Sequence, residues 1–72
     1  MPKKLRELKA SLLRAGFACR SGKGSHTVWG HPDLAVRIVL SGKDGNDAKP
    51  YQEHDVAEGL RLAAEQEKDE EQ

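Results

Sequence analysis

Residues 17–40 read FACRSGKGSHTVWGHPDLAVRIVL, and in them three short apolar segments alternate with turn residues. The segments carry aromatic and β-branched side chains, which favour strands. Glycine admits positive φ in the first connection, and Pro32 in the second cannot donate to a β-ladder. Because such short turns join antiparallel neighbours, the sequence predicts a three-stranded antiparallel meander. The predicted strands are residues 17–20, 26–31 and 35–40.

Side-chain alternation assigns each strand residue to one face of this sheet. We expect Trp29 and Thr27 to point into the protein layer, which places His26 and Val28 on the opposite face. In the third strand, Arg37 falls on the face opposite its apolar neighbours. The sequence therefore predicts an open sheet face that carries an imidazole and a guanidinium group.

Amphipathic helices are predicted on both sides of the meander. Leucines recur at helical spacing within residues 3–15, and Gly16 is expected to end this helix in a left-handed cap. A second helix is predicted from Pro50 to about Glu65. Two helices on one face of a small sheet give an α+β fold with the order α-β-β-β-α. We expect residues 1–65 to form one domain and residues 66–72 to be an acidic, disordered tail.

The length and composition exclude several classes of protein. A chain of 72 residues buries a marginal core, which argues against a doubly wound sheet, a barrel or a deep cofactor cavity. We accordingly expect no cofactor. No apolar run approaches the roughly 20 residues of a membrane span, and a single cysteine cannot form an internal disulfide. A cytoplasmic protein is expected.

The formal net charge of zero conceals a strong asymmetry along the chain. Residues 1–43 hold nine basic and two acidic side chains, whereas residues 44–72 hold three basic and ten acidic ones. Such a division indicates that the first part faces an anionic partner. It is equally consistent with two halves that attract each other, or with dimerisation through complementary faces.

The segment Gly22-Lys23-Gly24-Ser25-His26 offers the clearest chemistry. Glycines let the backbone approach a phosphate closely, and Lys23 supplies positive charge. An imidazole can transfer protons near neutral pH, as RNA cleavage requires. The spacing is not that of a Walker A loop. A glycine-rich hairpin followed by a surface histidine is the commoner occurrence of such a pattern.

The other candidate residues point to structure rather than chemistry. No Cys/His cluster has zinc spacing, and the acidic residues near Asp44 lack the closing ligand of a calcium loop. No metal ligand is therefore expected. His31 is predicted to be a turn residue, His54 a solvated helix residue and Cys19 a small core residue.

One pattern of motifs runs through the first half of the chain: a leucine-bearing helix that ends in Gly-Phe, then an arginine, Gly-Lys-Gly-Ser-His, an aromatic residue and His-Pro-Asp. This pattern resembles the HicA-type toxins of bacterial type II toxin–antitoxin pairs. The resemblance covers residues 3 to about 62. The matching residues are Leu12, Gly16, Phe17, Arg20, Gly22, Lys23, Gly24, Ser25, His26, Trp29, His31, Pro32 and Asp33.

This resemblance implies a fold similar to double-stranded-RNA-binding domains and an endoribonuclease (mRNA interferase) that acts on mRNA. It implies that His26 is the catalytic residue and that a HicB-type antitoxin neutralises the toxin by covering the site. The candidate residues for binding RNA and phosphate are Arg20, Gly22, Lys23, Gly24, Ser25 and Arg37.

Two departures from the family keep other functions open. Residues 41–50 differ from the Lys-Gly opening of the second helix in many HicA-like chains, so no role is transferred to them. The acidic second half would weaken phosphate contacts unless it points away from the RNA. The alternatives are a non-catalytic module whose basic helix and loop read A-form RNA, and a protein-interaction unit driven by charge.

Overall fold

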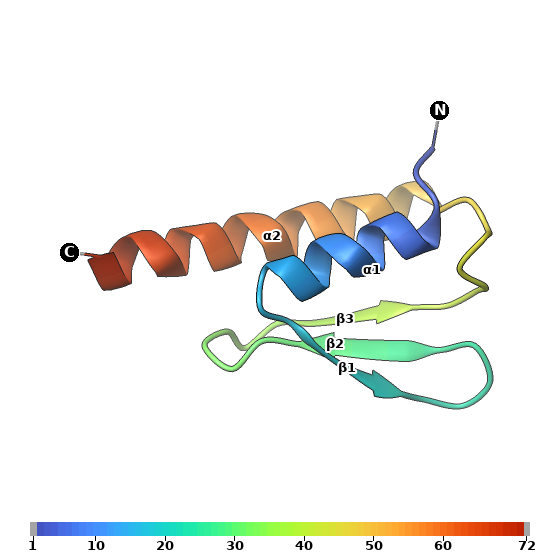
Figure 1. Cartoon of the computed structure of the whole chain (residues 1–72), viewed down its shortest axis with the longest axis horizontal. Coiled ribbons are helices and arrows are strands. Elements are labelled where there is room, and N and C mark those ends of the chain that lie inside the picture. Colours follow the sequence, from blue (N-terminus) through green and yellow to red (C-terminus); the bar gives the residue numbers. More distant parts are fainter. Residues whose placement is uncertain (1, 72) are drawn as a thin grey trace.

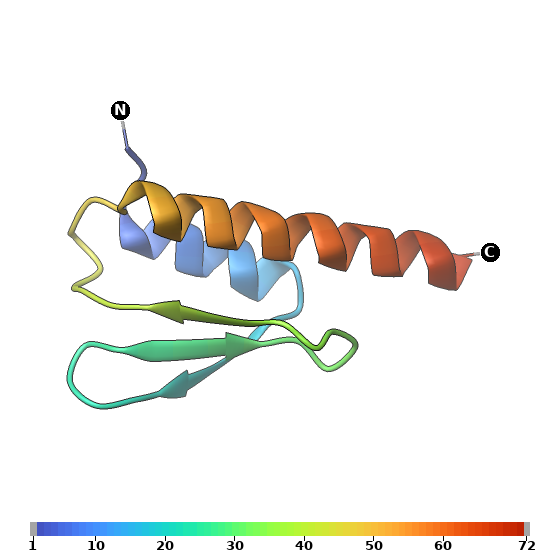
Figure 2. The same ribbon diagram turned by 180° about the vertical axis from the view of Figure 1, so that it is seen from behind.

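The computed structural model describes the backbone of residues 2–71 and the side chains of residues 2–66. Two helices form one layer and three strands form the other, so that one face of the sheet is covered and the other is open (Figures 1 and 2). The order α-β-β-β-α and the α+β class are as predicted. The elements are α1 (Leu5–Arg14), β1 (Ala18–Ser21), β2 (Thr27–Gly30), β3 (Arg37–Leu40) and α2 (Pro50–Glu71).

The sheet is an antiparallel meander with the strand order β1-β2-β3. Two cross-strand rows point to the face opposite the helices: Arg20–Val28–Val39 and Ala18–Gly30–Arg37. The second and third strands are shorter than expected, and the first is shifted by one residue. β1 begins at Ala18 because Phe17 packs into the core instead, and β3 begins at Arg37 because residues 31–36 form a loop.

The helix α1 ends as the sequence predicts. Gly16 has φ of 97°, Phe17 N donates to Leu12 O over 3.0 Å, and Gly16 N donates to Leu13 O over 3.1 Å. These two hydrogen bonds define a Schellman cap, in which a left-handed glycine satisfies the last carbonyls of a helix. The cap turns the chain so that Phe17 packs beside Leu12 in the core.

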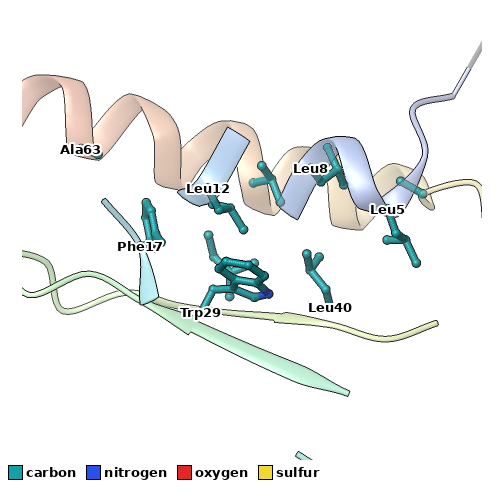
Figure 3. Close-up of a cluster of buried hydrophobic side chains, with 10 residues drawn as sticks. Leu5, Leu8, Leu12, Phe17, Trp29, Leu40 and Ala63 are labelled. Carbon is teal, nitrogen blue, oxygen red and sulfur yellow. The ribbon is translucent and has the colours of Figure 1, made fainter. Parts of the chain in front are cut away.

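The core lies between the helices and the covered face of the sheet. Leucines of α1 face Trp29 and Leu40 of the sheet, with Phe17 and Ala63 at the far end of the same cluster (Figure 3). Trp29 is 2% exposed, and its indole N–H donates to Thr27 Oγ1 over 3.0 Å. Trp29 and Thr27 therefore share the covered face, as expected.

Cys19 is not a core residue, which corrects the expectation from the sequence. It lies opposite Trp29 in the register, so side-chain alternation assigned it to the correct face, yet it is exposed. The reason is the position of β1, which is an edge strand and lies farthest from both helices (Figure 1). A side chain on the covered face is buried only where a helix packs over that part of the sheet.

The helix α2 packs on β3 through Gly59. A Cβ added there would lie 2.6 Å from Ile38 Cδ1 and 3.3 Å from Phe17 Cζ. Glycine lowers the stability of a helix by about 1 kcal/mol relative to alanine. Its lack of a side chain, in return, lets the helix pack closely on the sheet. Within the described part of the chain, neither α1 nor α2 is long and apolar enough to cross a membrane.

The helix α2 also continues beyond the expected end near Glu65, to Glu71. Residues 66–71 are Gln, Glu, Lys and Asp, and the first three types are good helix formers. The division into a domain at 1–65 and a separate disordered tail at 66–72 stays a prediction, since the side chains of 67–72 lie outside the described residues.

The polar connection between β3 and α2 packs against the start of α1. Its carbonyls at Asp44 and Asn46 accept the first free N–H groups of that helix, over 3.2 and 3.0 Å. Two ion pairs link the same segments, Lys4 to Asp47 and Lys9 to Asp44, each at 2.5 Å. The basic first part and the acidic second part of the chain therefore do attract each other where the β3–α2 connection meets α1.

Gln52 anchors the other end of this connection. Its side chain is 1% exposed, accepts a hydrogen bond from Lys49 N over 2.8 Å and donates one to Ser41 O over 3.1 Å. The amide thus caps the first turn of α2 and holds the segment that leaves β3.

Replacing Gly42 with alanine is expected to destabilise the protein by about 1–3 kcal/mol. Gly42 has φ of 114°, and an added Cβ would lie 2.9 Å from Leu5 Cδ1. Gly45→Ala in the same connection is the matched control, because no heavy atom lies within 4 Å of its added Cβ. Urea denaturation followed by circular dichroism measures both. Equal midpoints for the two variants would contradict the packing described here.

Candidate functional site

The turn between β1 and β2 is closed by its own backbone. Gly22 N donates to His26 O over 2.8 Å, and His26 N donates to Lys23 O over 3.2 Å. Gly24 has φ of 61°, a conformation that favours glycine. A Cβ on Gly22 would lie 3.3 Å from His26 O, so a side chain there would crowd the turn. Both glycines therefore shape the segment that presents Lys23 and His26.

The imidazole of His26 is exposed and held at one nitrogen. Its Nδ1 lies 3.1 Å from Lys23 O. A carbonyl oxygen can only accept, so Nδ1 must carry the proton of this hydrogen bond. In the neutral ring Nε2 then has a free lone pair. This arrangement orients the ring and leaves a proton acceptor available to a ligand.

Ser25 connects this turn to the β3–α2 connection. Its Oγ accepts a hydrogen bond from Gly42 N over 3.2 Å. The two segments lie at the same end of the sheet (Figure 1). The contact places the backbone of Lys43, an exposed residue, next to the turn that carries Lys23. Ser25 is thus a bridging residue of the site, and Lys43 is a neighbouring cation that the sequence did not single out.

The open face of the sheet is hollowed at the other end. A groove of about 630 Å³ lies beside the loop 31–36. Its lining includes Arg20 and Arg37, two of the predicted phosphate-binding residues. The residues around it are Gly16, Ala18, Arg20, Val28, Gly30, His31, Pro32, Leu34, Ala35, Val36 and Arg37.

The predicted site residues thus fall into two groups. Gly22, Lys23, Gly24, Ser25 and His26 form the turn at one end, whereas the two arginines border the groove. Arg20 stands in the cross-strand row of Val28, which is two residues from His26, the residue directly before β2. The structure therefore places Arg20 and Arg37 at the groove on the open face, and the other five candidates in the turn between β1 and β2.

Of the remaining histidines, His31 lines the groove and bonds within its own loop. His31 Nδ1 accepts a hydrogen bond from Asp33 N over 3.1 Å, and its ring meets Phe17 edge-on at a centroid distance of 5.1 Å. His31 is accordingly a turn residue, as predicted. His54 is exposed on α2, in the helix layer. No three His, Cys, Asp or Glu side chains gather into a possible metal site among the residues described.

Acidic side chains are mostly held away from the open face. Asp44 pairs with Lys9 of α1, Asp47 pairs with Lys4 directly before α1, and Glu58 pairs with Arg61 on α2. The hydrogen bond and charge of Arg61 lower the pKa of the Glu58 carboxyl, which keeps that acid ionised and paired. Arg37 borders a small hollow of about 220 Å³ that Glu58 also lines, but it forms no ion pair within the described part of the chain.

The sequence missed the groove because it arises from tertiary structure. Residues 31–36 were predicted to be a turn and the start of a strand, yet they form a loop that walls one side of the open face. One local signal was present: a glycine inside a strand, at Gly30, often marks a place where another group approaches the backbone.

Comparison with known proteins identifies the family. The model of the HicA toxin family of bacterial toxin–antitoxin systems matches residues 5–62. A search of curated proteins and a search of solved structures found no match. The family match covers α1, all three strands, the turn at His26 and the first part of α2, up to residue 62. The chain therefore belongs to the HicA family of toxins of bacterial toxin–antitoxin systems.

Proposed function

We propose that this toxin is an endoribonuclease that cleaves mRNA and uses His26 as its general acid/base. The observation that carries the proposal is the state of the imidazole. It is exposed at the end of the open sheet face, and the bond from Nδ1 to Lys23 O leaves Nε2 free. A histidine that is held at one nitrogen and free at the other suits proton transfer.

The reaction needs few groups from the protein. The ribose 2′-oxygen attacks the neighbouring phosphorus and the bond to the 5′-oxygen breaks, which yields a 2′,3′-cyclic phosphate and a 5′-hydroxyl. Nε2 of His26 takes the proton of the 2′-hydroxyl, and the resulting imidazolium is the donor that protonates the departing 5′-oxygen. The carbonyl of Lys23 stabilises that imidazolium through Nδ1–H.

The cations of the open face hold the RNA in this proposal. Lys23 lies in the turn with His26, and Arg20 and Arg37 border the groove. Their charges bind phosphate oxygens and stabilise the negative charge that develops on the phosphorus centre. Gly22 and Gly24 keep the turn narrow, and Ser25 fixes it against Gly42.

The partner that neutralises this activity is a HicB-type antitoxin. It would act by covering the open face and thereby block His26 from RNA. This surface also exposes an apolar side chain, Val39, which is 48% exposed in the row of Arg20. A mixture of cations and apolar area suits a protein partner that is acidic at its centre of contact.

The substitution His26→Ala is expected to abolish growth arrest and to lower cleavage of RNA by about a hundredfold to ten-thousandfold. Growth after induction and single-turnover cleavage of a labelled oligoribonucleotide measure this. His54→Ala is the matched control, since it removes an exposed histidine of the helix layer. A single 2′-deoxy nucleotide at the cleavage site should protect the substrate.

Equal cleavage by wild type and His26→Ala would refute the assignment. Binding of RNA without any product from the wild type would instead favour a non-catalytic RNA-binding module.

Lys23→Gln is expected to reduce the slope of log affinity against log salt by about 0.7 on single-stranded RNA, because one phosphate contact is lost. Arg6→Gln, an exposed charge on α1, should leave the slope unchanged. Fluorescence anisotropy over a range of salt concentrations measures both. An equal decrease in slope for the two variants would indicate that RNA binds the helix layer, as expected of a module that binds A-form duplexes.

A further inference from the structure

The groove on the open face has a simple origin in the register of the sheet. In the row Ala18–Gly30–Arg37, the central and one flanking side chain are small or absent. No heavy atom lies within 4 Å of a Cβ added to Gly30. The neighbouring row, by contrast, carries Val28 at its centre. The sheet is therefore hollow over Gly30.

The loop 31–36 turns this hollow into a groove. Pro32, Leu34 and Val36 line it from the loop, and Leu34 and Val36 also pack against the core. The wall is thus fixed by the same apolar contacts that stabilise the fold. The volume of about 630 Å³ lies in the range of roughly 300–1,000 Å³ that is typical of ligand pockets.

The lining of the groove mixes polar and apolar groups. Arg20, Arg37 and the imidazole of His31 line it together with aliphatic side chains and backbone. Neither arginine has an ion-pair partner among the described side chains. The loop's carboxylate, Asp33, is not part of the lining. A planar group with apolar faces, attached to an anionic chain, fits such a site. Guanidinium planes also stack on unpaired bases.

The position of the groove relates it to the proposed catalytic residue. Val28 is two residues from His26 along the strand and Gly30 is four, so the groove begins about 7 Å and centres about 13 Å from that position. A nucleotide in the groove therefore lies near the scissile phosphate without being the one whose ribose reacts.

We propose that this groove binds an unpaired nucleobase of the RNA, next to the cleavage site, and so makes cleavage depend on the base at that position. This inference rests on the proposed function and adds a base subsite to it. Only single-stranded RNA can fill the groove, because a base in a duplex is stacked and paired. Arg20 and Arg37 hold the flanking phosphates or cover the face of the base.

Gly30→Val tests the proposal. The new side chain fills the groove where space is open, the φ of Gly30 is not positive, and valine favours strands. In the His26→Ala background, which prevents cleavage, affinity for a single-stranded oligoribonucleotide should fall about tenfold. Affinity for a duplex of the same length should not change. Gly45→Val is the matched control in open space outside the groove.

A second arm locates the base. Removing bases from the oligonucleotide one at a time should weaken binding to the parent protein strongly at one position near the cleavage site. The same abasic substitution should have no further effect on Gly30→Val. Ala18→Leu, which fills the groove from the exposed strand β1, should repeat the result if Gly30→Val lowers the melting temperature.

The outcomes separate this inference from the proposed function. Unchanged affinity of folded Gly30→Val and Ala18→Leu, or abasic effects that are uniform along the oligonucleotide, would overturn the base subsite while leaving cleavage by His26 intact. Loss of single-stranded affinity in a protein that never cleaves RNA would support the subsite and refute the nuclease.

Discussion

Burial of the Trp29 indole determines which residues of the central strand are open to solvent. The ring lies under the helices, and its N–H is satisfied by Thr27 Oγ1, which in turn donates to Leu40 O over 3.3 Å. Because side chains alternate along a strand, fixing these two residues inward forces His26, Val28 and Gly30 outward. A shift of the register by one residue would bury the imidazole and expose the indole, at the cost of the largest side chain of the core. The core and the candidate site are thus specified by the same alternation.

The sequence predicted this alternation because it is a local property, and the left-handed cap at Gly16 for the same reason. It also predicted the α-β-β-β-α order, since hydrophobic periodicity and turn residues are readable residue by residue. It failed at Cys19, whose burial depends on how far the helix layer extends over an edge strand. It likewise missed the buried amide of Gln52, because a capping role depends on the distant Ser41 as well as on its own helix.

The candidate site, like the fold, could be predicted where it depends on local sequence pattern. The residues of the turn and the face of Arg37 follow from local pattern: the turn lies between β1 and β2, and Arg37 lies on the open face. The groove does not follow from pattern, because it requires the small row at Gly30 to coincide with a loop that folds beside it. If the third strand had begun at residue 35, as predicted, residues 35 and 36 would belong to the sheet and would not form a loop beside Gly30.

The distribution of charge explains how a chain with no net charge can present a cationic surface. Four acidic residues of the second half lie on α2 or in the β3–α2 connection and form ion pairs: Asp47 with Lys4, Asp44 with Lys9, and Glu58 and Glu65 with Arg61. Each pair is exposed and contributes little to stability. Its consequence for binding is larger, since it neutralises cations on the layer away from the open face. The arginines that remain without a carboxylate partner among the described side chains include Arg20 and Arg37. The acidic half therefore directs an anionic ligand towards the sheet, because it weakens the attraction of the helices for the same ligand.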